Sequence, residues 1–307
     1  MLHASRHLLW HMLRHTLLWL LLMSGCSSPS ARQAEDERIV ALTPSLASAL
    51  IAIEPTALLV GTTQYTDWPE SARRVATLPM PTPPEQVLAL RPTLVLAHPA
   101  SLQLIAKLES LHIPVFAHAM DTLPDIFETL QSLGHALHVP QKGLLAARRL
   151  QAELDAVTQG HKEAPAIRLL FIIDVADARM QQFYTAQNDA YLAALSQNCG
   201  GQTLAADTSR WGRITAEALI RLDPPAILFL SPDETTGNER RRMFTELYPT
   251  LRAVKDGRIY FLNGASYSIP DTRLPKTQAA ICLAIDTLRS AKSSGDASPC
   301  AAIGAAY

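Results

Sequence analysis

Short apolar runs alternate along the chain with longer segments whose apolar residues recur at helical spacing. In the first half we expect strands at 38–42, 57–60, 93–97 and 114–117, and helices at 46–53, 84–90, 102–111 and 123–137. In the second half we expect strands at 168–174, 226–230 and 258–262, and helices at 190–198, 215–222, 238–254 and 272–290. Strands that are apolar throughout and alternate with helices indicate parallel sheets covered on both faces, which is an α/β fold.

A segment rich in Ala, Leu and Arg separates the two halves, from 141 to 162. Its apolar positions form one helical stripe: Leu144, Leu145, Leu150, Leu154 and Val157. A helix of this length would span about 30 Å and could act as a stiff strut between two lobes. Periodicity alone fits an ordinary helix within one lobe equally well.

An internal repeat links the two halves. Residues 85–96 (EQVLALRPTLVL) resemble residues 217–228 (EALIRLDPPAIL), and each phrase predicts a helix beginning near a Glu, a turn at Pro, and a buried strand. The repeat predicts two lobes of related build, with Glu85 and Glu217 at equivalent positions. Two such lobes facing each other would bind a ligand in the cleft between the carboxyl ends of their strands.

The N-terminus has the layout of an export signal. Arg6 and Arg14 precede an apolar run at 17–23 and a small-residue stretch that ends at Cys26. The run is shorter than the ~20 residues that a spanning helix needs. Small residues directly before Cys26 resemble a lipobox, which implies that Cys26 becomes the lipidated first residue. An ordinary signal peptide with an incidental cysteine is the alternative.

The expected organisation follows from these features: a signal peptide at 1–26, a flexible tether at 27–37, a first lobe at 38–140, a linking helix at 141–163, a second lobe at 164–290, and a disordered tail at 291–307. Composition agrees with a globular body, because 48% of residues are hydrophobic and 18% are charged. A net charge of −1 without a basic stripe argues against nucleic-acid binding. Apart from Cys26 the chain has Cys199, Cys282 and Cys300, which allow one disulfide. Cys199 and Cys282 belong to apolar periodic segments and Cys300 to the tail, which favours the first two.

Several motifs occur together in the order of a known family. They are RIVALTPS at 38–45, YTDWP at 65–69, the Glu85 phrase, YTA at 184–186, CGG at 199–201, WG at 211–212 and the Glu217 phrase. Over residues 38–289 the chain resembles the periplasmic-binding proteins for cobalamin, iron–siderophores and haem, whose lobes are joined by one long helix. Each motif is weak by itself, and their common order and spacing carry the resemblance.

The resemblance implies a monomeric, membrane-anchored binding protein in the periplasm or at the cell surface. It would capture a metal chelate (a ferric siderophore, haem or cobalamin) and deliver it to the permease dimer of an ABC importer. The cobalamin branch implies a disulfide between Cys199 and Cys282. The family pattern implies that Glu85 and Glu217 dock against permease arginines. Taken alone, each would be read as a carboxylate stabilised by the positive end of its helix.

The same resemblance implies the ligand-binding residues Tyr65 and Trp211, whose rings could stack on a chelate. The chain departs from the cobalamin branch at Leu78 and His98, where further aromatic residues are usual, and at 265–271, where it offers Tyr267. His98 could ligate a metal, form a hydrogen bond or lie in solvent. Arg273 could hold an anionic chelate or make a surface ion pair. The reduced aromatic set slightly favours a ferric chelate over cobalamin.

A metal-handling enzyme of chelatase type, also built on two lobes, is the alternative function. Such an enzyme needs His and acidic residues at metal-ligand spacing, and the histidines show no motif of the H-x-x-E-H kind. A phosphate-binding glycine loop and a G-x-S-x-G nucleophile turn are absent from the sequence too. We therefore expect a binding protein without catalytic residues, resident metal or cofactor, whose cleft loops decide which chelate is bound.

Overall fold

The computed structural model describes residues 37–54, 59–67, 70, 75–161, 165–204 and 211–291. Cys26, Cys300, the signal segment and nearly all of the tether and the tail lie outside these residues. Within the described part, no helix combines the length and the apolarity that crossing a membrane requires.

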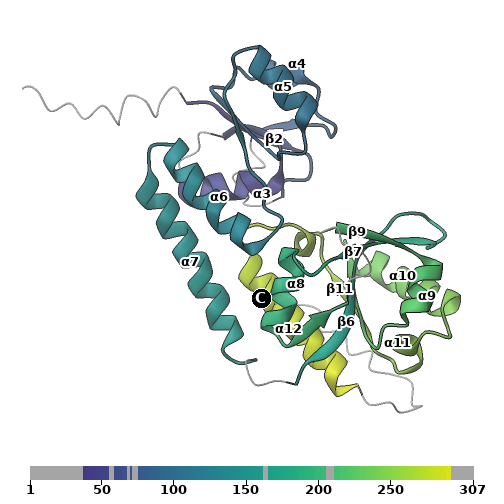
Figure 1. Cartoon of the computed structure of the whole chain (residues 1–307). Coiled ribbons are helices and arrows are strands. Elements are labelled where there is room, and N and C mark those ends of the chain that lie inside the picture. The colour runs from purple at the N-terminus through teal and green to yellow at the C-terminus, as the bar shows by residue number, and fades with distance from the viewer. Residues whose placement is uncertain are drawn as a thin grey trace, which may run out of the picture.

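The first lobe contains a five-stranded parallel sheet in the order β3-β2-β1-β4-β5 (Figure 1). Its strands are β1 (Ile39–Ala41), β2 (Leu59–Thr63), β3 (Ala76–Leu78), β4 (Leu94–Ala97) and β5 (Val115–Ala117). Its helices are α3 (Pro44–Ile53), α4 (Pro84–Ala89), α5 (Leu102–Ser110) and α6 (Leu123–Ala136). Each face of the sheet is covered, because alternate residues of β1 point to opposite cores: Ile39 packs with α3 and α6, whereas Val40 packs with α4 and α5.

The second lobe contains a mixed sheet in the order β11-β10-β6-β7-β9. Its strands are β6 (Ile167–Val175), β7 (Gln182–Ala186), β8 (Gly201–Thr203), β9 (Trp211–Thr215), β10 (Ile227–Ser231) and β11 (Ile259–Asn263). Strands β6, β10 and β11 are parallel, and β8 pairs in parallel with the start of β6. Strand β7 runs antiparallel to both β6 and β9. The sequence pattern predicted β6, β10 and β11, but neither the short parallel strand β8 nor the antiparallel strands β7 and β9.

The helices of the second lobe are α8 (Tyr191–Asn198), α9 (Ala216–Leu222), α10 (Glu234–Leu247), α11 (Arg252–Lys255), the short 3₁₀ helix η3 (Ala265–Ser268), and α12 (Leu274–Ser290). The single helix expected at 238–254 is in fact the two helices α10 and α11. Helix α10 begins earlier, because Asp233 caps it by accepting the N–H of Thr236 at 2.8 Å. It ends at Leu247 because Pro249 cannot donate the next helical hydrogen bond.

Helix α7 (Pro140–Thr158) runs along both lobes, next to α6 and α3 of the first and α12 of the second (Figure 1). It packs closely on α6: a Cβ added at Gly143 would lie 2.5 Å from the backbone oxygen of Leu130. Leu145 departs from the expected stripe, since 67% of its side chain is exposed. The remaining apolar face, with Leu150 and Leu154, joins one buried cluster that continues from the first lobe into α8 and α12. The two lobes therefore share a continuous core on this side.

A disulfide joins Cys199 and Cys282, with a sulfur–sulfur distance of 2.03 Å, which confirms the expected pairing. Cys199 ends α8 and Cys282 lies within α12, and both are buried. The bond fixes α8, which carries Tyr191 at the cleft, to the longest helix of the second lobe.

Candidate functional site

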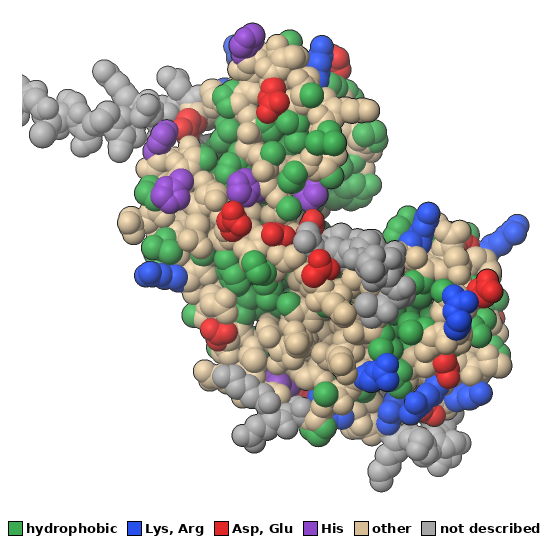
Figure 2. Space-filling view, in the orientation of Figure 1, with side chains coloured by type: hydrophobic (Ala, Val, Ile, Leu, Met, Phe, Trp, Pro, Cys, Tyr) green, Lys and Arg blue, Asp and Glu red, His purple; other side chains and the backbone are tan. Residues whose placement is uncertain are grey.

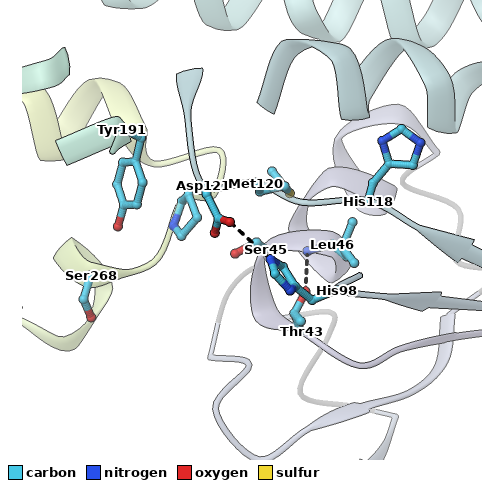
Figure 3. A pocket seen from close by; sticks show the side chains of 10 residues that line it. Thr43, Ser45, Leu46, His98, His118, Met120, Asp121, Tyr191 and Ser268 are labelled. Carbon is cyan, nitrogen blue, oxygen red and sulfur yellow. Dashed lines mark hydrogen bonds and ion pairs between the residues drawn. The ribbon is translucent and has the colours of Figure 1, made fainter. Parts of the chain in front are cut away.

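A pocket of about 190 Å³ lies where the two lobes meet, and the molecule is hollowed between the lobes (Figure 2). It is lined by Thr43, Ser45, Leu46, His98, His118, Met120, Asp121, Tyr191, Ser268 and Pro270. Figure 3 shows side chains from the first lobe on one side, with Tyr191 and Ser268 of the second lobe opposite. The pocket is smaller than the ~300 Å³ usual for a complete small-molecule site, so it suits one part of a larger ligand.

Parallel strands place the first-lobe residues of this pocket. Thr43 follows β1, His98 follows β4, and His118 follows β5, and these three strands are neighbours in the sheet. Their carboxyl ends therefore meet at one edge, which faces the second lobe. Thr43 also caps α3 by accepting the N–H of Leu46 at 3.2 Å, so the start of that helix lies at the pocket.

His98 and Asp121 form the polar pair at the centre of the pocket (Figure 3). The Nε2 atom of His98 is 3.4 Å from Oδ2 of Asp121, and the Nδ1 atom accepts the backbone N–H of Ala100 at 3.2 Å. The backbone oxygen of Asp121 accepts the N–H of Tyr191 at 2.8 Å, which ties the first lobe to the start of α8. Burial, together with the nearby carboxylates of Asp271 and Asp121, holds the pKa of Tyr191 well above its usual value, so this phenol stays protonated.

Arg273 joins the two lobes and has two carboxylates around it. Its Nε is 2.9 Å from Oδ2 of Asp271, and its Nη2 is 3.1 Å from Oδ1 of Asp67 in the first lobe. Burial raises the pKa of Asp271, against the opposing effect of Arg273. Burial alone would lower the pKa of Arg273, but its bonds to the two carboxylates raise it. The guanidinium is thus a shared counter-ion that also joins the lobes.

Of the four expected ligand residues whose side chains the structure describes, only His98 lines the pocket. Tyr65 lies beyond the end of β2 at the same sheet edge, with 60% of its side chain exposed. Tyr267 is half-buried against the large core, and burial raises the pKa of its phenol. Trp211 is the first residue of β9, opposite Ala186 of β7, and its side chain lies outside the described part.

Glu85 and Glu217 occupy matching places, each exposed in the first turn of its helix. Helix α4 precedes β4, which lies between β1 and β5; helix α9 precedes β10, which lies between β6 and β11. In both lobes the strand after the Glu-bearing helix therefore adjoins the first strand of the lobe. The sequence repeat corresponds to a repeat in topology.

Sequence reasoning missed Asp121, Ser45, Tyr191 and Ser268. Asp121 follows β5 by a few residues, so its position after a strand that ends at the cleft edge could have identified it. Tyr191 and Ser268 reach the cleft only through the packing of the second lobe against the first, which local pattern does not encode.

A second hollow, of about 380 Å³, lies within the second lobe between the β6–β7 turn and α10. It is larger than the cleft pocket but is lined by one lobe alone, from Val175 to Met180 and from Thr236 to Met243. Among the residues with described positions, no three His, Cys, Asp or Glu side chains gather where they could hold a metal ion.

Comparison with known proteins gives one family for most of the chain: the family model described as periplasmic binding protein matches residues 39–265. A substrate-binding lipoprotein of an uncharacterised ABC transporter of Bacillus subtilis is 24% identical over 74% of this chain and 72% of its own. A vitamin B12-binding protein of Vibrio parahaemolyticus is 23% identical over 80% of this chain and 88% of its own. The solved structure of a periplasmic haem-binding protein from Roseiflexus superposes with a TM-score of 0.68 at 18% identity, covering 82% of this chain and 98% of that one.

Proposed function

Because the chain belongs to the periplasmic binding protein family, we propose that it is the substrate-binding component of an ABC importer and carries a metal chelate. Residues 38–140 and 164–290 would be its two lobes, with residues 141–163 as the linking helix. The observation that carries the proposal is the pocket between the lobes, at the carboxyl ends of β1, β4 and β5. The chelate would be gripped there and released without chemical change. Nothing in the described part favours the chelatase-type alternative.

The ligand proposed is cobalamin, haem or a ferric siderophore. A vitamin B12-binding relative and a haem-binding protein of the same fold support this class of ligand. The apolar core that continues from the first lobe through α7 into α12 opposes large movements of one lobe relative to the other. We therefore expect a modest closure around the chelate.

The protein is proposed to work as a monomer held to a membrane by lipid on Cys26. The lipoprotein relative from Bacillus subtilis supports this anchor. Lipidation with more than one acyl chain holds a protein stably to a bilayer, which keeps the loaded protein near the importer. Mass spectrometry of the membrane-extracted protein tests the anchor: a diacylglycerol adduct at Cys26 is expected, and a free thiol there would refute it.

Docking to the permease is proposed to use Glu85 and Glu217. Their equivalent topology gives the protein two similar acidic points, which suits a permease dimer with two-fold symmetry. Reversal of both charges (Glu85→Lys with Glu217→Lys) should abolish uptake in cells and leave ligand affinity unchanged. Reversal of two exposed acids of the α6–α7 layer, Glu128→Lys with Glu153→Lys, is the control and should leave uptake intact. Loss of ligand affinity in the first pair would show instead that those residues line the site.

The ligand itself is tested by titrating the purified protein with cyanocobalamin, haemin, a ferric trihydroxamate and a ferric triscatecholate. Quenching of tryptophan fluorescence should saturate at one equivalent for at least one of these chelates. Failure of all four to bind at 100 µM would overturn the proposed function.

A further inference from the structure

Asp121 lines the pocket and its side chain is partly exposed there. About a quarter of its side chain, 26%, is exposed, and Figure 3 shows the carboxylate facing His98 and Ser45 at the centre of the pocket. Its backbone is fixed on both sides, by Tyr191 of the second lobe and by the capping box of Thr122 that opens α6. Asp121 therefore presents hydrogen-bond acceptors from a rigid position between the lobes.

His98 orients this carboxylate and has no lone pair left for a metal. Because Nδ1 accepts the N–H of Ala100 at 3.2 Å, we assign the ring hydrogen to Nε2. That hydrogen is directed towards Asp121, at an Nε2–Oδ2 distance of 3.4 Å. Both ring nitrogens are thus in use, and a metal bond to His98 would require one of these contacts to break.

Arg273, which joins the two lobes, is already neutralised. Asp271 and Asp67 both contact it, whereas Asp121 is paired with His98. The positive end of α6 favours negative charge nearby, and the chain already places two carboxylates there: Asp125 in the first turn and Asp121 directly before the Thr122 cap. A carboxylate on an incoming ligand would therefore meet the negative charge of Asp121, while Arg273 is already engaged by two carboxylates.

We propose that Asp121, oriented by His98, is the specificity residue of the cleft and accepts hydrogen bonds from carboxamide groups on the rim of the chelate. The inference rests on the proposed function and names its ligand class: a metal chelate rimmed by amides, such as a corrinoid, in preference to one rimmed by carboxylates. Asp121 would accept a hydrogen bond from an amide N–H of the chelate. The hydroxyl groups of Tyr191, which stays protonated, and of Ser268 would face the same amide from the second lobe. The pocket of about 190 Å³ holds such a rim group while the ring stays in the open cleft.

The first test compares two ligands on the unaltered protein, so it does not depend on any variant folding. Cyanocobalamin and its monocarboxylic acid, in which one peripheral amide is replaced by a carboxylate, are titrated in parallel. We expect the amide form to bind at least tenfold more tightly than the isomer whose carboxylate enters the pocket. Equal affinities for all monoacid isomers would overturn the inference.

The second test replaces the acceptor. Asp121→Asn should weaken cyanocobalamin binding about tenfold and bring the amide-to-acid ratio close to one, because an amide side chain bonds either group. Glu128→Gln, an exposed acid-to-amide change on α6, is the matched control and should leave both affinities unchanged. An unaltered ratio in a folded Asp121→Asn protein would refute the role of Asp121.

The third test asks whether His98 binds metal. Aquacobalamin has an axial water that imidazole can replace, so its visible spectrum on the protein should show no imidazole coordination. A coordination shift that disappears in His98→Gln would make His98 a metal ligand and overturn the inference. Binding of haemin or a ferric siderophore alone would likewise overturn it while leaving the proposed function standing, whereas no binding of any chelate would overturn both.

Discussion

Replacing Arg273 by methionine separates its structural role from a role in binding an anionic ligand. Of the two carboxylates that pair with Arg273, Asp271 should dominate the loss of stability, because only 1% of its side chain is exposed, against 42% for Asp67. Without the guanidinium, a buried carboxylate either stays charged and unpaired or takes up a proton. Breaking a buried ion pair on one side costs about 3–5 kcal/mol.

Protonation sets an upper limit to this loss. An aspartate with an ordinary pKa of 3.8 that must be neutral in the folded protein at pH 7 costs about 4 kcal/mol, at 1.36 kcal/mol per pH unit. We therefore expect Arg273→Met to lower the free energy of unfolding by about 3 kcal/mol at pH 7. In the folded variant, we expect the pKa of the Asp271 carboxyl to lie above its value in the unfolded chain. The penalty therefore grows as pH rises above about 4 and is largely absent below it.

Urea unfolding at pH 7 and pH 4.5 measures both the size and the pH dependence of the deficit. Lys276→Met, on the first turn of the same helix and exposed, is the control and should change stability by less than about 0.5 kcal/mol. Adding Asp271→Asn to Arg273→Met should recover most of the loss at pH 7. An Arg273→Met protein as stable as the parent at pH 7, or a deficit of equal size at both pH values, would refute the reasoning.

Two further predictions concern the scaffold of the cleft. Replacing Cys199 and Cys282 together by serine opens a loop of 83 residues. The chain-entropy relation then gives a loss of about 4.5 kcal/mol in urea unfolding, and a loss below about 1 kcal/mol would contradict it. Gly143→Ala should destabilise the protein by about 1–3 kcal/mol, because the new Cβ would lie 2.5 Å from backbone of α6, although alanine is the better helix former. Gly160→Ala, with nothing within 4 Å of its new Cβ, is the control; equal effects on the melting temperature would disprove the close-packing argument.

The fold was predictable where one local rule decides. Strands β1, β4, β10 and β11 are apolar on both faces, so their sequences alone identify them as buried parallel strands. The repeat at Glu85 and Glu217 also predicted two related lobes, because a repeated sequence pattern implies a repeated helix–turn–strand unit. Strand β7 was not predicted because buried and exposed residues alternate along it: Phe183 is buried and Tyr184 is 44% exposed. This strand pairs in an antiparallel arrangement with β9.

The site was harder to predict because it forms between the lobes. His98 follows a buried strand and could be placed at the cleft edge from the sequence. Asp121 and Tyr191 meet only when the start of α8 lies against the segment before α6, at a hydrogen bond between residues seventy positions apart. The two carboxylates that pair with Arg273 also come from opposite lobes. The sequence could not show that the charge of Arg273 is already balanced, so binding of an anionic ligand remained an alternative.

Anomalous diffraction from crystals grown with the tightest-binding chelate tests the central claim most directly. The metal peak should lie in the cleft between the first-lobe residues around Asp121 and Ser268 of the second lobe, without a bond to His98. A bond from a metal to an imidazole nitrogen is short, about 2.0–2.1 Å for zinc, so a coordinating His98 would be evident from the position of the peak. A metal peak outside the cleft, such as in the hollow between the β6–β7 turn and α10, would contradict the account.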